Sequence, residues 1–394
     1  MSLKLDKSTW MRVAFGDVVR NVNETVKNAS GNGIDRVIAM EHMDPGELKI
    51  ERWGDLADET TFTRRVRPGQ TLFGKRRAYQ RKVAYAEFDA ICSGDIYTFV
   101  ADETRMLGEF LPFLVQSDSF FEHALATSAG SLSPRTNWRE LADFAFDLPP
   151  LEVQRQVVGL LTAVEGHARA LKQSREIVTE LLSAQANSLF DRHKENLVRL
   201  RTVGATSAQS VQVGPFGGSL SSRHFTESGT RVLKIQNITD DGSWDLDHAV
   251  YVADQYASTL ERYMVQADDL IFAAQATVGR CALAPKAIVG ALISQHLIRV
   301  RLDRDKALPA FMHAMALSTG VQDQMRAIKT KTTRDGLNTA DVENFEVPIP
   351  TMPEQIAFVE LREQGVSAIE AITRELHDLM QVRRETVGRF FGGN

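Results

Sequence analysis

An internal duplication constrains this sequence more than any other feature. The segment Asn137–Gln154 matches the segment Asn338–Gln355, and the two are 201 positions apart. The pairs aligned by this offset include Asn137 with Asn338, Phe144 with Phe345, Leu148 with Ile349, Pro149 with Pro350 and Gln154 with Gln355. A repeat this long is far larger than a solenoid unit, so each copy is expected to be a domain in its own right.

Earlier blocks of the two halves also resemble each other, in the same order. Val66–Phe73 resembles Val265–Phe272, and Arg36–Met40 resembles Arg231–Ile235. The same alignment places Arg81 opposite Arg280 and Ser93 opposite Ser294. Chance does not readily preserve such an order, so we infer that one ancestral unit was duplicated.

Each copy is predicted to consist of a mixed α/β domain followed by one long helix. Short apolar runs with turn residues between them, such as 36–40, 96–100 and 297–301, are typical of strands. Pro149 and Pro150 end the first domain because proline resists strand pairing. The expected segments are 1–150 and 196–350 for the domains, and 151–195 and 351–394 for the helices.

Both expected helices carry an apolar stripe at helical spacing. The first stripe comprises Val157, Leu160, Leu161, Val164, Ala168, Leu171, Val178, Leu181, Leu182 and Leu189; the second comprises Val359, Val366, Ile369, Ile372, Leu376, Leu379, Met380, Val387 and Phe390. A helix of about 40 residues is roughly 60 Å long and cannot bury its stripe inside one small domain. The predicted fold class is therefore α+β: two α/β domains in pseudo-twofold repeat, separated by two long helices that form an antiparallel coiled coil. The alternative is two helices that each lie on their own domain.

The faces of these helices that are left over are candidates for docking a partner. They carry Arg155, Lys172 and Arg175 on the first helix and Arg362, Arg374 and Arg383 on the second. Ordinary solvated helix surface is the alternative interpretation of these residues.

Composition indicates a soluble globular protein, with 43% hydrophobic and 25% charged residues. No apolar run approaches the roughly 18 residues of a membrane span, and the N-terminal segment lacks the apolar core of a signal peptide. Cys92 and Cys281 are isolated, so we expect two buried, reduced thiols and no zinc site. The cytoplasm is the expected compartment.

The sequence offers no catalytic constellation. Asp147–Glu152 is only superficially similar to the Asp-Pro-Pro-Tyr signature of adenine methyltransferases, because a leucine separates the aspartate from the prolines and no aromatic residue follows. The glycine-rich segment Gly214–Ser222 lacks the lysine of a phosphate-binding loop, and the nine histidines are scattered. We therefore expect a binding protein with no catalytic residues, no metal and no cofactor.

Charge distribution points to nucleic acid more than net charge does. The net charge of −5 argues against a nucleic-acid binder. However, the stretch from Arg64 to Lys82 holds eight basic residues and no acidic one. Local charge decides binding to a polyanion, because Lys and Arg release counterions only where they touch phosphate.

In the first domain, the predicted DNA contacts come from this basic stretch. Arg76, Arg77 and Arg81 can make bidentate contacts to guanine or phosphate, and Lys75 and Lys82 suit phosphate alone. Tyr79 lies among them and can stack or donate a hydrogen bond. The alternative is a solvated surface loop.

In the second domain, the corresponding candidates are fewer and more dispersed. Thr277 and Arg280 occupy the equivalent block, and Lys234 and Gln236 lie in a strand-like repeat where alternate residues face opposite sides. The expected phosphate contacts are Arg223, Lys329, Lys331 and Arg334. Surface residues without a ligand are the equally weighted alternative.

Four motifs, taken in order, resemble those of a known family, the specificity (S) subunits of type I restriction–modification systems (HsdS). They are Arg36–Gly46, Leu148–Gln154, Gly214–Leu220 and Ala276–Arg280. The last is similar to the family's Gly-Thr-Ile-Gly-Lys block with alanine in first place, and Lys75–Tyr79 replaces that block in the first copy. The resemblance covers essentially the whole chain.

The resemblance implies a non-catalytic subunit in which each domain reads one half of a split double-stranded DNA site. Because the two domains differ in sequence, that site would be bipartite and asymmetric. The helices would set the gap and dock two methyltransferase subunits, which a restriction subunit can join. Two alternatives remain open at this stage: a helical scaffold without DNA readout, and a stand-alone DNA-modifying enzyme.

Overall fold

The structure is a computed structural model that describes residues 6–56, 60–130, 133–206, 210–275, 278–331 and 336–391. The chain divides into two compact units. Unit 1 comprises residues 1–172 together with 374–394, and unit 2 comprises residues 173–373. Within the described residues, no helix combines the length and the apolar character that crossing a bilayer would require.

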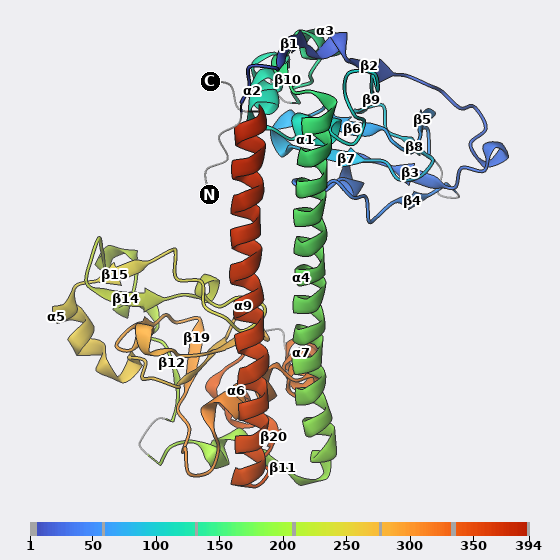
Figure 1. Cartoon of the computed structure of the whole chain (residues 1–394). Coiled ribbons are helices and arrows are strands. Elements are labelled where there is room, and N and C mark those ends of the chain that lie inside the picture. The colour runs from blue at the N-terminus through green and yellow to red at the C-terminus, as the bar shows by residue number, and fades with distance from the viewer. Residues whose placement is uncertain are drawn as a thin grey trace. The chain divides into compact units, whose positions relative to one another are not determined.

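Unit 1 contains two four-stranded sheets and a two-stranded ribbon (Figure 1). One sheet has the order β2-β9-β6-β7 and the other has the order β4-β3-β8-β5, while β1 pairs with β10. The strands are β1 Met11–Ala14, β2 Val19–Val22, β3 Arg36–Ile38, β4 Gly54–Asp55, β5 Arg64–Val66, β6 Thr71–Gly74, β7 Val83–Tyr85, β8 Ala90–Cys92, β9 Ile96–Ala101 and β10 Ala145–Leu148. The short helices are α1 Leu111–Val115, α2 Asp118–Ala126 and α3 Trp138–Ala142.

Unit 2 repeats this set of sheets and has one more short α-helix among its described residues. Its sheets have the orders β12-β19-β16-β17 and β13-β15-β14-β18, and β11 pairs with β20. The strands are β11 Leu197–Arg199, β12 Val211–Val213, β13 Phe225–Thr226, β14 Thr230–Leu233, β15 Val250–Val252, β16 Leu270–Ala273, β17 Cys281–Leu283, β18 Leu292–Ile293, β19 Leu297–Val300 and β20 Glu346–Pro348. The short helices are α5 Asp254–Ala257, α6 Pro309–Leu317, α7 Thr319–Lys331 and α8 Thr339–Glu343.

The duplication extends to individual backbone hydrogen bonds. In unit 1, β3 pairs in parallel with β8, and in unit 2, β14 pairs in parallel with β18. The Ser93 N–H donates to the carbonyl of Ile38 at 2.9 Å, and the Ser294 N–H donates to the carbonyl of Leu233 at 3.0 Å. The sequence alignment of Ser93 with Ser294 is therefore confirmed.

The alignment of Arg81 with Arg280 is wrong by one residue. The N–H of Gly74, at the end of β6, donates to the carbonyl of Lys82, whereas the N–H of Ala273, at the end of β16, donates to the carbonyl of Arg280. The ladder thus pairs Lys82 with Arg280. The β6–β7 connection is one residue longer than the β16–β17 connection, which a comparison without gaps cannot register.

The two long helices are α4, Leu151–Arg192, and α9, Met352–Phe391, with 42 and 40 residues. Within unit 1, the Arg383 guanidinium pairs with the Glu165 carboxylate at 2.9 Å and His167 Nε2 lies 2.8 Å from Glu375 Oε1. In these pairs a higher number on one helix accompanies a lower number on the other, so the segments are antiparallel.

Unit 2 holds the other halves of the same helices, and they are also antiparallel. The Arg362 guanidinium donates to the carbonyl of Leu182 at 3.2 Å, and His193 Nε2 lies 3.1 Å from Glu354 Oε1. Gly365 permits the close approach, because a Cβ at this position would lie 2.7 Å from a Leu182 methyl carbon. The predicted pairing of the two helices is therefore confirmed.

Two details of the helix prediction need correction. Several residues of the expected stripe are exposed instead of buried, among them Leu160, Leu181, Val366 and Met380. Conversely, Arg383 and Arg362 do not lie on free helix faces, because Arg383 is held by Glu165 and Arg362 is largely buried beside Leu182. Lys172 is engaged as well, in an ion pair with Glu47. The spacing of apolar residues predicts a helix, but not which part of its surface is buried. A helix that contacts both a partner helix and a domain buries a wider part of its surface, displaced from the predicted stripe.

A buried glutamine fixes each long helix to the domain that precedes it. In unit 1, Gln154 Oε1 accepts from the Leu107 N–H at 2.8 Å, and its amide donates to the carbonyls of Arg105 and Pro149 at 2.9 and 2.8 Å. In unit 2, Gln355 makes the equivalent three bonds to Leu308, Lys306 and Pro350 at 2.9, 3.2 and 3.0 Å. All the donor and acceptor positions correspond at the 201-residue offset.

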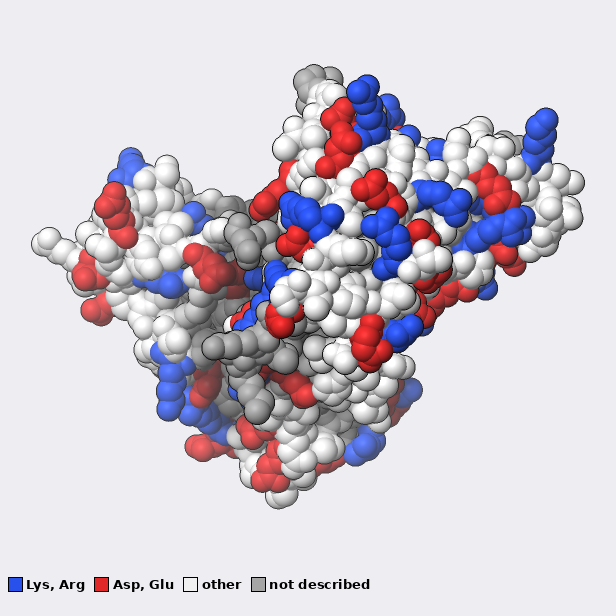
Figure 2. Space-filling model, turned by 45° about the horizontal axis from the view of Figure 1, so that its top comes forward, with Lys and Arg blue, Asp and Glu red and all other residues white. Residues whose placement is uncertain are grey.

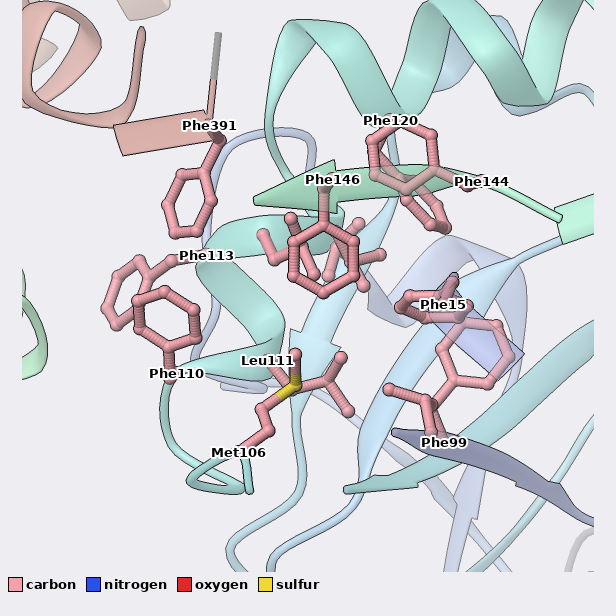
Figure 3. Packing of buried hydrophobic residues seen from close by; sticks show 14 of the residues in the cluster. Phe15, Phe99, Met106, Phe110, Leu111, Phe113, Phe120, Phe144, Phe146 and Phe391 are labelled. Atoms are coloured by element: carbon pink, nitrogen blue, oxygen red, sulfur yellow. The ribbon is translucent and has the colours of Figure 1, made fainter. Parts of the chain in front are cut away.

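The core of unit 1 also secures the end of α9. Aromatic side chains from the sheet, the short helices and β10 meet here, and Phe391 at the end of α9 packs against Phe110 with ring centroids 5.0 Å apart (Figure 3). The Ser119 hydroxyl donates to the Phe391 carbonyl at 2.6 Å. In unit 2, Phe190 occupies the corresponding place on α4, against Gly320.

Replacing the buried glutamine tests how strongly the helix is fixed to the domain. Gln154→Ala leaves one N–H and two carbonyls of the buried junction without partners, which we expect to lower the free energy of unfolding by about 2–4 kcal/mol in urea titrations. Gln156→Ala, which changes an exposed glutamine one half-turn further on, is the matched control and should change it by less than about 0.5 kcal/mol. Equal effects of the two substitutions would contradict this role of Gln154.

His313 couples the stability of unit 2 to pH. It lies on α6, where its Nε2 donates to the carbonyl of Cys281 at 3.1 Å in the neutral form. Burial lowers the pKa of His313 to about 4 from 6.5. His313 therefore becomes protonated below about pH 6.5 in the unfolded chain, but only near pH 4 in the folded chain. The contribution of His313 to the free energy of unfolding is fully present above pH 6.5 and is lost as the pH falls from 6.5 towards 4.

We expect His313→Gln to weaken this pH dependence. Between pH 7.5 and pH 5 the unfolded parent gains a proton that the variant lacks, so the parent should lose about 2 kcal/mol more of its free energy of unfolding than the variant does. Urea titrations at both pH values measure the difference. The exposed His248 offers the control His248→Gln. A His313→Gln variant with the parent's pH dependence would show that the imidazole is not held neutral.

Candidate nucleic-acid interface

The connection between β6 and β7 carries the basic residues that the sequence singled out. It contains one short 3-10 turn, Ala78–Gln80, flanked by Arg77 and Arg81, whose φ angles are 55° and 52°. Residues other than glycine rarely adopt this left-handed conformation, so the surrounding contacts must hold it in place. The Lys75 N–H donates to the carbonyl of Asp95, and the Arg77 N–H donates to that of Pro134 at 2.8 Å.

Most cations of this connection serve the protein itself. Arg76 pairs with Asp95 at 3.5 Å and donates to the Ser133 hydroxyl at 2.9 Å. Arg81 pairs with Asp118 at 2.6 Å, and its guanidinium lies 4.5 Å from the centre of the Phe121 ring. The Lys82 ammonium donates to the carbonyl of Met40 at 2.7 Å. These side chains brace the loop, and Asp95 and Asp118 offset part of its charge.

Arg77 and Tyr79 are the residues of this connection that face solvent. Tyr79 is 55% exposed, and the Arg77 guanidinium donates to the Ser133 hydroxyl at 3.3 Å. Among the described residues, no carboxylate lies within ion-pair distance of Arg77. Lys75 is half-buried over the Tyr97 ring, and burial lowers the pKa of its ammonium. Fewer residues of the predicted basic cluster are therefore accessible to a ligand than the sequence alone indicates.

The remaining arginines of the basic stretch bind acidic or polar groups from other strands. Arg65 pairs with Asp89 at 2.9 Å, and Arg67 pairs with Glu24 at 2.7 Å. Arg64 donates to the Asn23 amide oxygen at 2.9 Å and to the carbonyl of Ile96. The acid-free run is therefore partly neutralised in three dimensions, which sequence alone does not show.

The candidates of unit 2 are also partly engaged. Arg280 pairs with Asp240 at 2.6 Å and donates to the carbonyl of Ile238 at 2.9 Å. The Lys234 ammonium lies 4.7 Å from the centre of the Phe225 ring, and Gln236 is exposed. Arg223 is exposed and donates to the carbonyl of Gly218 at 2.8 Å. Among these residues, Arg223 and Gln236 are the most accessible to a ligand.

Other predicted contacts of unit 2 fall outside what the structure describes. Thr277 and Arg334 lie outside the described residues, and so do the side chains of Lys329 and Lys331 in α7. Their roles stay predictions. Figure 2 shows that Lys and Arg are interspersed with Asp and Glu on the face in view, so charge alone does not single out one surface there.

Sequence reasoning missed a cleft in unit 2 of about 1190 Å³. Residues of α4, α6, α7 and α9 and the loop that holds Asp240 line it, and its arginines are Arg175, Arg280 and Arg362. The acidic residues on its walls are Glu176, Glu180, Asp240, Asp241 and Glu370. No motif announces the cleft, because its residues come from segments that the fold alone brings together.

Comparison with known proteins finds similarity to one family. Residues 217–378 match the family model described as the type I restriction modification DNA specificity domain. The chain is 22% identical over 167 residues to the type I restriction enzyme EcoDI specificity subunit of Escherichia coli, covering 42% of this chain and 36% of that one. It is 18% identical over 350 residues to the MjaVIII specificity subunit of Methanocaldococcus jannaschii, covering 82% of this chain and 76% of that one.

Solved structures share the whole fold at low identity. The type I restriction-modification S subunit from M. genitalium aligns with a TM-score of 0.61 at 13% identity, covering all of this chain and 99% of that one. A chain from a study of complex assembly and conformational transition of the type I R-M system aligns with a TM-score of 0.61 at 17% identity, covering both chains fully.

The duplicated α/β domain and the paired helices form the same fold as these solved S-subunit structures. Residues 217–378 thus match a type I specificity domain, and the chain is similar to the specificity (S) subunits that the sequence motifs predicted. The alignments with the EcoDI and EcoBI specificity subunits of E. coli span only 36% and 32% of the length of those relatives.

Arg77 should contribute to DNA affinity without contributing to stability. Because Arg77 is exposed and has no carboxylate partner among the described residues, we expect Arg77→Ala to weaken binding to a cognate duplex by about 1–3 kcal/mol if it reads a base. Fluorescence anisotropy on cognate and altered duplexes measures the loss. Arg155→Ala, on the first turns of α4, is the matched control. An equal loss on every duplex would show that Arg77 touches phosphate only.

Proposed function

We propose that this chain is a sequence-specific DNA-binding subunit that recognises a bipartite, asymmetric double-stranded site and directs the methyltransferase subunits of a type I complex to it. The observation that carries the proposal is the duplicated domain, in which a buried glutamine fixes each copy to a long helix. Gln154 and Gln355 hold each α/β domain to the start of a long helix through the same three hydrogen bonds. A rigid junction of this kind suits a reader whose two halves are set at a defined spacing.

The two reading surfaces are unlike, which favours an asymmetric site. The β6–β7 connection presents Arg77 and Tyr79, whereas in the shorter β16–β17 connection Arg280 is tied to Asp240. An exposed arginine and tyrosine offer bidentate and stacking contacts to bases. A protein with two unlike readers has no reason to prefer a palindrome, which symmetric dimers require.

The helices are proposed to dock the methyltransferase subunits. Their exposed apolar residues are Leu160, Ile177 and Leu181 on α4 and Ile356, Leu361, Val366, Met380 and Val382 on α9. Exposed apolar side chains that recur along a helix are typical of a contact surface for another chain. Since both helices carry such residues at related positions, two methyltransferase subunits fit the repeat, and a restriction subunit can join them.

In this proposal the chain itself carries out no chemistry and requires no cofactor. Methyl transfer and cleavage belong to the partner subunits, which act on DNA in the cytoplasm. Experiments can distinguish this function from the two alternatives, a stand-alone enzyme and a scaffold. A stand-alone enzyme would methylate DNA as the purified chain with S-adenosylmethionine, and a scaffold would not bind DNA.

DNA binding should depend steeply on salt. A protein that contacts phosphates releases counterions, so the logarithm of the association constant should fall linearly with the logarithm of the salt concentration, with a slope of about −0.9 per phosphate contact. Titrations of the full-length chain with a labelled duplex between low and moderate salt give this slope. An affinity that does not change over this range would contradict the DNA-reading function and favour the scaffold.

A further inference from the structure

The loop that follows β12 presents an aromatic side chain to solvent. Phe216 is 66% exposed, more than any other large apolar side chain that the structure describes, and it belongs to none of the hydrophobic clusters. Gly214 and Pro215, which precede it in this loop, are buried, whereas Gly217, Gly218 and Ser219, which follow it, are exposed. Phe216 is therefore the one large apolar side chain in an exposed stretch of four described residues, 216–219.

The backbone before Phe216 is fixed by close packing. The Gly214 N–H donates to the carbonyl of Leu297 at 3.0 Å. A Cβ at Gly214 would lie 2.1 Å from the carbonyl oxygen of Ser294, so only glycine allows the strand ends to approach this closely. The backbone two residues before Phe216 is therefore held against the Ser294 and Leu297 backbone.

The backbone after Phe216 is held by two side chains. Gly217 has a φ of 62°, which turns the chain sharply. The Arg223 guanidinium donates to the carbonyl of Gly218 at 2.8 Å, and the Tyr256 hydroxyl donates to the carbonyl of Ser219 at 2.6 Å. With anchors on both sides, the ring is presented with little conformational freedom left to lose on binding, which favours affinity.

The surroundings of Phe216 favour a polyanion over an apolar protein partner. No Asp or Glu occurs between Glu195 and Glu227 in the sequence. Arg223, which holds the loop, is exposed, and within the described residues no carboxylate lies within ion-pair distance of it. An exposed ring in a loop that is held by an exposed guanidinium without a carboxylate partner matches the combination of stacking and phosphate contact by which proteins bind nucleic acid.

Among the described residues, the segment of unit 1 that corresponds to this loop presents no exposed aromatic ring. The segment that follows β2 there contains Glu24, which pairs with Arg67 at 2.7 Å, and Thr25, which forms a bridge to Arg64. An acidic residue held by arginines occupies the place that the aromatic loop has in unit 2. The two domains thus differ in the kind of contact they offer, and not only in charge.

We propose that Phe216 stacks on an unstacked base step of the DNA half-site that the second domain reads, with Arg223 contacting the adjacent phosphate. The inference rests on the proposed DNA-binding function and names one contact that makes this half-site unlike the other. Apolar side chains that insert between base steps partly unstack and kink the duplex.

The test uses the full-length chain and duplexes that carry 2-aminopurine at successive positions of the second half-site. The parent should raise the fluorescence at the position where it unstacks a base. Phe216→Ala should abolish this signal and weaken binding by roughly 5- to 150-fold, the range expected for one aromatic–base stack. The slope of affinity against salt should stay the same, since no charge is removed. Phe216→Tyr should restore both affinity and fluorescence.

The matched control is Val289→Ala, which truncates another exposed apolar residue of unit 2. It should leave binding and fluorescence as in the parent, and circular dichroism checks that all variants are folded. If Phe216→Ala binds like the parent and gives the same fluorescence, the stacking role is wrong while DNA recognition stands. If the parent itself shows no salt-dependent binding, the proposed function fails and the stacking role fails with it.

Discussion

The hydrogen bonds of Gln154 and Gln355 are the constraint on which the arrangement of this molecule depends. Each glutamine is fully buried and satisfies one N–H and two carbonyls where a domain passes into a long helix. A buried amide that satisfies all these groups at once fixes direction as well as position, because hydrogen bonds weaken quickly with angle. The helices therefore continue the domains rigidly instead of hanging from them by a linker.

The duplication gives the chain one scaffold and two different surfaces. The scaffold is repeated in detail between the halves, including a left-handed residue at Gly69 in unit 1 and at Asp268 in unit 2. Each donates its N–H to the carbonyl of the alanine that directly follows a strand, Ala86 after β7 and Ala284 after β17. The loops are not conserved: one half presents Arg77 and Tyr79, and the other presents Phe216. Rigid packing of the scaffold permits the loops to change without loss of the fold.

The sequence predicted the architecture well because its signals are periodic and repeated. The helices follow from the spacing of their apolar residues, and the pairing of Ser93 with Ser294 follows from the offset. The sequence alignment was wrong by one residue where the two connections differ in length, as at Arg81 and Lys82. The predicted helix stripe was wrong where a helix contacts two neighbours, as at Leu181. The local spacing of apolar residues indicates neither the length of an insertion nor which part of a helix surface is in contact with its neighbours.

The functional surface was harder to predict, for a physical reason. A run of arginines is visible in sequence, but the carboxylates that neutralise it come from distant strands, as Glu24 and Asp89 do for Arg67 and Arg65. The sequence identified the loop that holds Phe216 as glycine-rich, yet exposure of the ring follows only from the packing of Gly214 on Ser294. A search for lone aromatic residues within glycine-rich loops could have found it.

Selection of bound sequences from a random duplex library, using this chain together with the proposed methyltransferase subunits, tests the central claim most directly. The account predicts a split site, with two unlike specified blocks separated by an unspecified gap of fixed length. A single contiguous block, a palindrome or no enrichment at all would contradict it.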